Sequence, residues 1–263
     1  MSSFRRTDRC QAANPATCWK HGDYILPAAT SIPVHSHKDA SGKVKFFLTD
    51  TEQQAITGYL NQDYTQLNAA LKGGEPLTSE LSRQIETIHE ALTRSQKIVS
   101  SQEPLLTFRA TKTYCNFSSL QETHNWMKEH FKEGSTITLP GFTSVTANPA
   151  AIFDFLTVAS EDEKPNVGMM PWQSSTAEEW YKKKESSANP GLGNLVFVVE
   201  TRTGVPVSGY GQFHSDKELE YLYPKDTKFK VKKVLPYRRI PHPDPEGFRK
   251  SAHASVVFLE ETR

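Results

Sequence analysis

The sequence has few cysteines, no long apolar run and almost no net charge. Its three cysteines, Cys10, Cys18 and Cys115, are odd in number and widely spaced, which argues against a disulfide framework. No apolar run approaches the roughly 20 residues of a membrane-spanning helix, and the apolar stretch at 25–29 is too short for the core of a signal peptide. We therefore expect a chain without membrane contact, either cytoplasmic or delivered by a non-classical route.

The balance of charge argues against a further class of partner. Lys and Arg number 31 and Asp and Glu 30, which leaves a formal net charge of +1. Such a chain lacks the long-range attraction that draws strongly basic proteins to nucleic acid. We do not expect a nucleic-acid partner, although balanced charge does not exclude a nucleic-acid substrate. At 263 residues with 37% hydrophobic composition, the chain is long enough for one folded domain and an extension.

The chain divides by texture into two parts. Residues 1–48 carry scattered prolines and histidines without apolar periodicity, and we predict that they form a loosely ordered extension. Within it, Cys10, Cys18 and His21 are residue types that bind zinc. Their spacing matches no strong zinc-finger pattern, so a zinc site and an ordinary polar segment both stay open. Residues 49–263 are predicted to form the folded domain.

In the folded part, helices are predicted first and strands mostly later. Thr49 with Glu52 has the spacing of a capping box, and apolar residues then recur at helical spacing up to a glycine pair at 73–74. A second helix is predicted from about Thr78 and a third after Ser119. Strands are predicted around 105–109, 137–139, 195–199, 229–231 and 256–259, and the polar stretch 159–193 is expected to cross the surface. Helices and strands without regular alternation indicate an α+β fold.

Two polar stretches follow predicted strands and could carry chemistry. Arg109 ends an apolar strand directly after Phe108, where a guanidinium suits phosphate or carboxylate. A surface arginine with a buried stem is the alternative. Ser144 and Thr146 lie in a tight bend, where hydroxyl groups also commonly bond their own backbone.

Two glutamates open a predicted strand in the last third of the chain. Glu218 and Glu220 are two residues apart, so on a regular strand their side chains project to the same side, with Leu219 on the other. Two neighbouring carboxylates repel, and one of them should be harder to ionise unless cations or donors compensate. On its own, the pair is also consistent with an exposed acidic strand.

An arginine on a first strand, aromatic-x-Ser-x-Thr on a second and Glu-x-Glu on a third resemble the arginine–serine–glutamate class of ADP-ribosyltransferases. That class includes cholera-type toxins, clostridial binary toxins and vertebrate ecto-enzymes. The surroundings agree, because Pro224 and Phe229 follow the acidic pair as they do in the family. The early helix is also similar, and its matching positions are Tyr59, Tyr64, Asn68 and Lys72.

The resemblance implies a fold of two packed, mostly antiparallel β-sheets flanked by amino-terminal helices, with NAD as co-substrate. It assigns Glu220 to the positive charge that builds on the ribose as nicotinamide leaves, and Arg109 to the diphosphate. Ser144, helped by Thr146, would orient Glu220. Phe153 would stack on nicotinamide, with a buried core phenylalanine as the alternative.

The resemblance also concerns the acceptor. Glu218 implies transfer to arginine, since a guanidinium attacks only when a base accepts its proton or draws its charge into place. Tyr210 and Phe213, in the preceding loop, would meet the target. The expected partner is a target protein with an acceptor arginine, and an immunity or delivery partner is left open. Val145 stands where the family usually has threonine.

Three hypotheses of function follow. The first is an arginine-specific mono-ADP-ribosyltransferase acting as an effector or toxin on a protein of another cell or a host. The second keeps the fold but performs NAD hydrolysis alone or transfer to a nucleobase. The third is a degenerate, non-catalytic binding module. The presence of all three polar motifs favours an enzyme.

Overall fold

The computed structural model describes residues 48–74, 76–99, 104–113, 120–139, 141–156, 158–160, 193–207, 219–243 and 250–262. Within these residues the helices are α1 (Asp50–Gly58), α2 (Tyr64–Leu71), α3 (Ser79–Val99) and α4 (Leu120–His130). A π-helical turn, η2 (Tyr59–Asp63), joins α1 to α2, and a 3-10 helix, η3 (Ala151–Phe155), follows the third strand. No described helix is both long and apolar enough to cross a membrane.

Within the described residues, nine strands form one hydrogen-bonded sheet. They are β1 (Leu105–Lys112), β2 (Thr136–Thr138), β3 (Thr143–Thr146), β4 (Val158–Ser160), β5 (Asn194–Thr201), β6 (Val205–Pro206), β7 (Glu220–Tyr223), β8 (Lys228–Pro241) and β9 (Lys250–Glu261). Their order is β2-β8-β9-β5-β1-β3-β7-β6, and β4 pairs with β9. Among the described pairings only β5 and β9 run parallel. The predicted mixed α+β fold with mostly antiparallel strands is confirmed.

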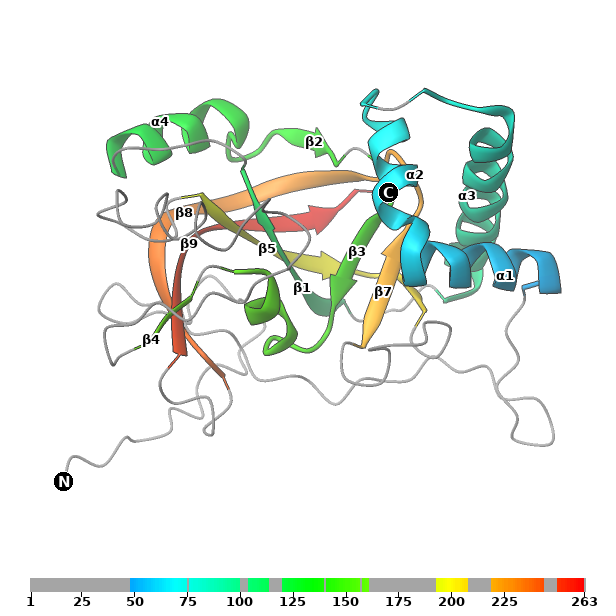
Figure 1. Cartoon of the computed structure of the whole chain (residues 1–263). Coiled ribbons are helices and arrows are strands. Elements are labelled where there is room, and N and C mark those ends of the chain that lie inside the picture. The colour runs from blue at the N-terminus through cyan, green and yellow to red at the C-terminus, as the bar shows by residue number, and fades with distance from the viewer. Residues whose placement is uncertain are drawn as a thin grey trace.

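Strand pairing is shortest between β1 and β3. The neighbouring pairs β1–β5 and β3–β7 are matched along their whole shorter strand, whereas β1 and β3 share a single register pair, Phe108 opposite Thr146. The predicted two sheets are therefore two halves of a continuous sheet that meet at this junction. Figure 1 shows helices α1, α2 and α3 gathered beside the β3–β7 half, with α4 over β8.

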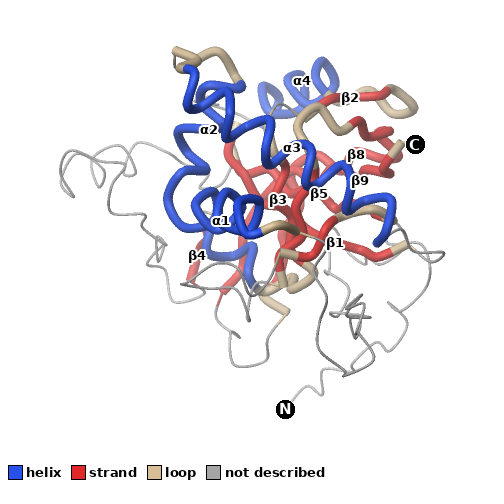
Figure 2. Tube along the Cα trace, turned by 90° about the vertical axis from the view of Figure 1, so that its right-hand side faces the viewer, coloured by secondary structure: helices blue, strands red, loops and turns tan. Residues whose placement is uncertain are grey.

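Apolar periodicity explains how the helices cover the sheet. In α3 the buried residues recur at spacings of three and four, and in α1 and α2 Ile56 and Leu67 are buried. These side chains form one core cluster with Phe142 and Leu222 of the β3–β7 half. Figure 2 shows the three helices stacked in front of the strands. The first two helical predictions are confirmed, because their apolar residues lie in this cluster, and the third is confirmed by α4, whose Met127 is buried in a different cluster.

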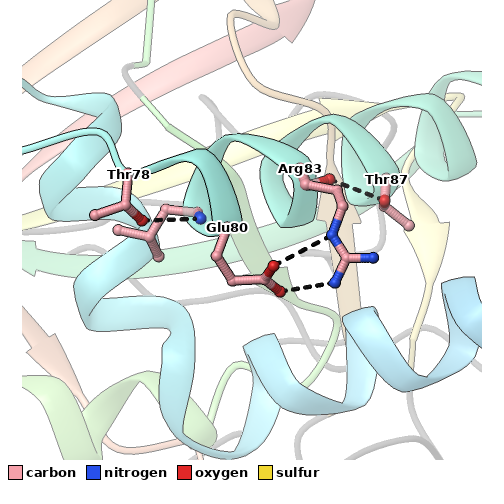
Figure 3. Close-up of polar contacts among 5 residues, drawn as sticks. Thr78, Glu80, Arg83 and Thr87 are labelled. Atoms are coloured by element: carbon pink, nitrogen blue, oxygen red, sulfur yellow. Dashed lines mark hydrogen bonds and ion pairs between the residues drawn. The ribbon is translucent and has the colours of Figure 1, made fainter.

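The second predicted helix, which is α3 in the structure, begins where the sequence predicts. The Thr78 hydroxyl accepts the backbone N–H of Leu81 at 3.2 Å, and Glu80 forms an ion pair of 2.9 Å with Arg83 one turn on (Figure 3). The Thr87 hydroxyl donates to the Arg83 carbonyl oxygen at 2.9 Å in the same exposed stripe. The Thr78 contact satisfies a backbone donor of the first turn, and the other two contacts lie on the face opposite the core.

Several predictions concern residues outside the described ranges. The amino-terminal extension is described only at Leu48, which packs partly buried against the helical core cluster. The zinc candidates Cys10, Cys18 and His21 lie outside the described residues, as does most of the predicted surface stretch 159–193. The boundary near residue 48 and the zinc hypothesis both stay predictions.

We predict that Thr49→Ala destabilises the protein by about 1 kcal/mol, the usual effect of removing an N-cap hydroxyl. Thr49 and Glu52 form the predicted capping box, because the Thr49 N–H donates to the Glu52 carboxylate at 2.8 Å and the Thr49 hydroxyl accepts the Glu52 N–H at 3.3 Å. Denaturant unfolding measures the change. Exposed Thr51 on the same helix is the matched control, and an equal loss in Thr51→Ala would contradict the capping role.

Candidate active site

The strand junction brings together three of the residues that the sequence singles out. Arg109 lies on β1, Ser144 on β3 and Glu220 at the start of β7. The Ser144 hydroxyl donates a hydrogen bond to Oε1 of Glu220, and Arg109 Nη1 donates to the backbone oxygen of Ser144 at 2.7 Å. All three side chains therefore share one site, and Ser144 links the cation to the anion.

Local packing explains why β1 presents an arginine here. Phe108 is buried in one core cluster, and Leu106 and Ala110 pack partly buried against the same cluster. Arg109 is the intervening residue, so its stem leaves the strand toward the other side, as strand alternation requires. The apolar residues before and after Arg109 thus determine the side of the strand on which its side chain lies.

Thr146 uses its hydroxyl differently from Ser144. It lies directly opposite Glu220 in the β3–β7 register, but its hydroxyl accepts the backbone N–H of Asn148 at 2.9 Å and donates to the Asn148 carbonyl at 3.3 Å. Asn148 in turn accepts the backbone N–H of Ala150 at 3.0 Å through its own side chain. Thr146 therefore holds the turn that leads from β3 into η3.

The region ahead of Glu220 departs from the predicted regular strand. β7 begins at Glu220, and Leu219 has φ 48, in the left-handed region that non-glycine residues rarely adopt. The expected strand therefore does not extend to Leu219, and the placement of Glu218 beside Glu220 stays a prediction. Glu218, Tyr210 and Phe213 lie outside the described residues.

Two residues of the first helical segment also belong to the surroundings of the site. Burial raises the pKa of Tyr59 to about 12, and the charges of Arg109 and Glu220 act on it with opposite signs. Partial burial, followed by repulsion from Arg109, lowers the pKa of Lys72. A second cation thus lies within the field of Arg109. The sequence analysis includes Lys72 in the family-like helix but assigns it no role in the site.

The aromatic candidate Phe153 is a core residue. It is 5% exposed, belongs to the cluster around Phe108 and contacts the ring of His242 at a centroid distance of 4.5 Å. Phe155, two residues further along η3, is 44% exposed. Of the two phenylalanines in this turn, only Phe155 presents much of its ring to solvent.

Comparison with known proteins shows the family to which the chain belongs. The model of the family described as ADP-ribosyltransferase exoenzyme matches residues 36–250, and the chain belongs to that family. Enzymes of this family are transferases that take ADP-ribose from NAD, so NAD is the co-substrate. No curated protein sequence matches the chain.

Solved toxin structures share the fold at low sequence identity. The C3 exoenzyme of Clostridium limosum is similar with TM-score 0.52 and 13% identity, over 83% of this chain and 88% of that one. Plx2a, an ADP-ribosyltransferase toxin from Paenibacillus larvae, gives 0.51 and 16%, over 82% and 88%. The enzymatic component C2-I of the Clostridium botulinum C2-toxin gives 0.51 and 16%, over 82% of this chain but 44% of that one. The chain thus spans less than half of C2-I.

We predict that Ser144→Ala lowers kcat for nicotinamide release about 100-fold, as loss of a preorganised hydrogen-bond donor does. Thr146→Ala should instead leave kcat within about 3-fold and cost about 1 kcal/mol of stability, the usual worth of a hydrogen bond. Steady-state kinetics and denaturant unfolding of both variants separate the two effects. Equal kinetic losses would show that the two hydroxyls act alike.

Proposed function

We propose that the protein is an arginine-specific mono-ADP-ribosyltransferase that transfers ADP-ribose from NAD to a target protein and releases nicotinamide. The observation that supports this most is the Ser144 hydroxyl bonded to the Glu220 carboxylate while Arg109 holds the backbone of the same serine. A carboxylate, a neutral hydroxyl and a cation are thereby fixed relative to one another before any substrate binds.

Glu220 is proposed to stabilise the substrate's ribose as the bond to nicotinamide breaks. Positive charge builds on the sugar in that step, and a fixed carboxylate favours it most when the site is shielded from water. The Ser144 hydroxyl donates to Glu220 and restricts its rotation. The carboxylate therefore needs little reorientation to reach its position in the transition state.

Arg109 and Lys72 are proposed to attract the diphosphate of NAD. A guanidinium carries five N–H donors on a rigid plane. In Arg109, Nη1 donates to the Ser144 carbonyl oxygen. The positive charge of Arg109 acts on Lys72, and this supports the proposal that both cations face one anion. The repulsion between them in the free protein is relieved when a diphosphate binds.

Acceptor recognition is proposed to come from the chain ahead of β7. Glu218 would take up the charge or proton of an acceptor arginine, and Tyr210 and Phe213 would contact the target protein. These assignments rest on the sequence pattern Glu218-Leu219-Glu220 and on its resemblance to arginine-modifying members of the class. We also propose that the catalytic domain begins near residue 49, where α1 is capped.

NAD hydrolysis without transfer is the second candidate. The described residues supply the groups for cleaving the bond to nicotinamide, namely Glu220, Ser144 and Arg109, and none of these contacts requires an acceptor. Water could then take the place of the arginine. The two functions share every step up to nicotinamide release, so only an acceptor assay separates them.

We predict that Glu220→Ala lowers nicotinamide release about 10³-fold, because the charge on the ribose loses its fixed counter-charge. Glu218→Gln should retain NAD hydrolysis within a few-fold but abolish labelling of agmatine and of arginine-containing proteins. Radiolabelled NAD with agmatine measures both reactions in one sample.

Glu218→Gln and Glu220→Ala serve as controls for each other in this assay. Persistent agmatine labelling in Glu218→Gln would refute the acceptor role of Glu218. Nicotinamide release by the unaltered protein with no label on agmatine or on protein would favour hydrolysis as the function.

We further predict that the two phenylalanines of η3 separate in function. Phe155→Ala should raise KM for NAD about 5- to 10-fold, the worth of one aromatic contact with nicotinamide, and leave stability unchanged. Phe153→Ala should destabilise the protein by about 3–5 kcal/mol, since it empties a buried ring site. Kinetics and unfolding of both variants test this, and an unchanged KM in Phe155→Ala would exclude contact with the donor.

A further inference from the structure

We infer that Asn68 is a positioning residue, whose side-chain amide clamps the bend that leads into β3 and so sets the place of Ser144. The inference rests on the proposed role of Ser144 and Glu220 and extends the site to a residue on α2. Asn68 is linked to the site by its hydrogen bond to the backbone of Phe142, ahead of Ser144.

Both ends of the Asn68 amide are engaged. Its Oδ1 accepts the backbone N–H of Phe142 at 2.9 Å, and its Nδ2 donates to the Tyr59 hydroxyl at 3.0 Å. An amide held by a donor on one side and an acceptor on the other has a single favourable orientation. Asn68 thus holds Phe142, which lies two residues before Ser144.

The π-helical turn makes this contact geometrically possible. Tyr59 and Asn68 are nine residues apart, and on a straight α-helix nine residues span about 2.5 turns, which places two side chains on opposite faces. The π-turn Tyr59–Asp63 interrupts the helix between them, and α1 and α2 run in clearly different directions (Figure 1). Such turns bend helices, and here the bend brings the Tyr59 hydroxyl to the Asn68 amide.

The bend that leads into β3 packs closely against the same amide. Gly141 has φ 83, a conformation that glycine adopts without strain. A Cβ at this position would lie 2.5 Å from Asn68 Oδ1. The Phe142 ring packs against Tyr59 with centroids 5.4 Å apart. The amide therefore fits closely over a bend that glycine adopts without strain.

The clamp acts on the part of β3 that the sheet holds least. β3 pairs with β1 at a single register position, Phe108 opposite Thr146, which is at the far end of the strand from Phe142. The beginning of β3 is held by β7 on one side and by Asn68 at the bend. Loss of the amide should shift Ser144 relative to Arg109, and displacements near 1 Å cost about 100-fold in rate.

The test compares kcat and KM for nicotinamide release in the full chain. Asn68→Ala should lower kcat about 10- to 100-fold and change KM for NAD by less than about 3-fold, because donor binding is retained while the alignment of Ser144 is lost. Asn68→Asp should recover most of kcat, because its carboxylate still accepts the Phe142 N–H. Gln66→Ala, exposed on the same helix, is the control and should behave as the unaltered protein.

Gly141 provides a second, independent arm. Gly141→Ala should lower kcat because its methyl group meets Asn68 Oδ1. If one clamp carries both effects, the double variant Gly141→Ala/Asn68→Ala is no slower than the slower single variant. Multiplying effects in the double variant would overturn the inference.

Glu220→Ala separates failure of this inference from failure of the proposed function. If Glu220→Ala retains nicotinamide release, the proposed catalytic assignment fails. If Glu220→Ala is inactive while Asn68→Ala keeps its kcat, or raises KM alone, the catalytic assignment stands and the positioning role of Asn68 is refuted. Circular dichroism of each variant confirms that the fold is retained.

Discussion

The site depends on how β3 is held between two halves of one sheet. β1 and β3 share one register pair, so backbone hydrogen bonds alone fix this junction weakly. The Arg109 bond to the Ser144 carbonyl crosses the same gap. The guanidinium thus has a structural role besides supplying a positive charge, because it connects β3, which carries Ser144, to β1.

The surroundings of the junction strengthen its electrostatics. Core clusters lie on both sides of β3, with Phe142 buried in the helical cluster and Val145 in the cluster that includes Tyr221. Apolar packing lowers the local dielectric, so a carboxylate and a guanidinium act on a bound substrate more strongly than they would in water. The high pKa of Tyr59 has the same cause, since burial disfavours its ionised form.

Much of this arrangement is visible in the sequence, and its limits have physical reasons. The capping box at Thr49 and the apolar stripes are local patterns, so the helices follow from them directly. The π-turn leaves no comparable local pattern, and the sequence accordingly predicts one uninterrupted helix up to the glycine pair. Phe153 and Phe155 differ only in which one faces the core, which the register of a single short turn decides. Lys72 is linked to the site only through the charge of Arg109, which acts on it across the fold.

The hydroxyl motif itself shows how one strand serves two purposes. Ser144 and Thr146 lie on one face, where one holds Glu220 and the other the turn into η3. Val145, between them, points the other way, is 2% exposed and lies opposite Tyr221 in the register. A hydroxyl there would enter an apolar cluster and need a partner to avoid a desolvation cost of about 1–3 kcal/mol. Valine in place of the threonine common in the class therefore suits the core of this chain and leaves both hydroxyl contacts intact.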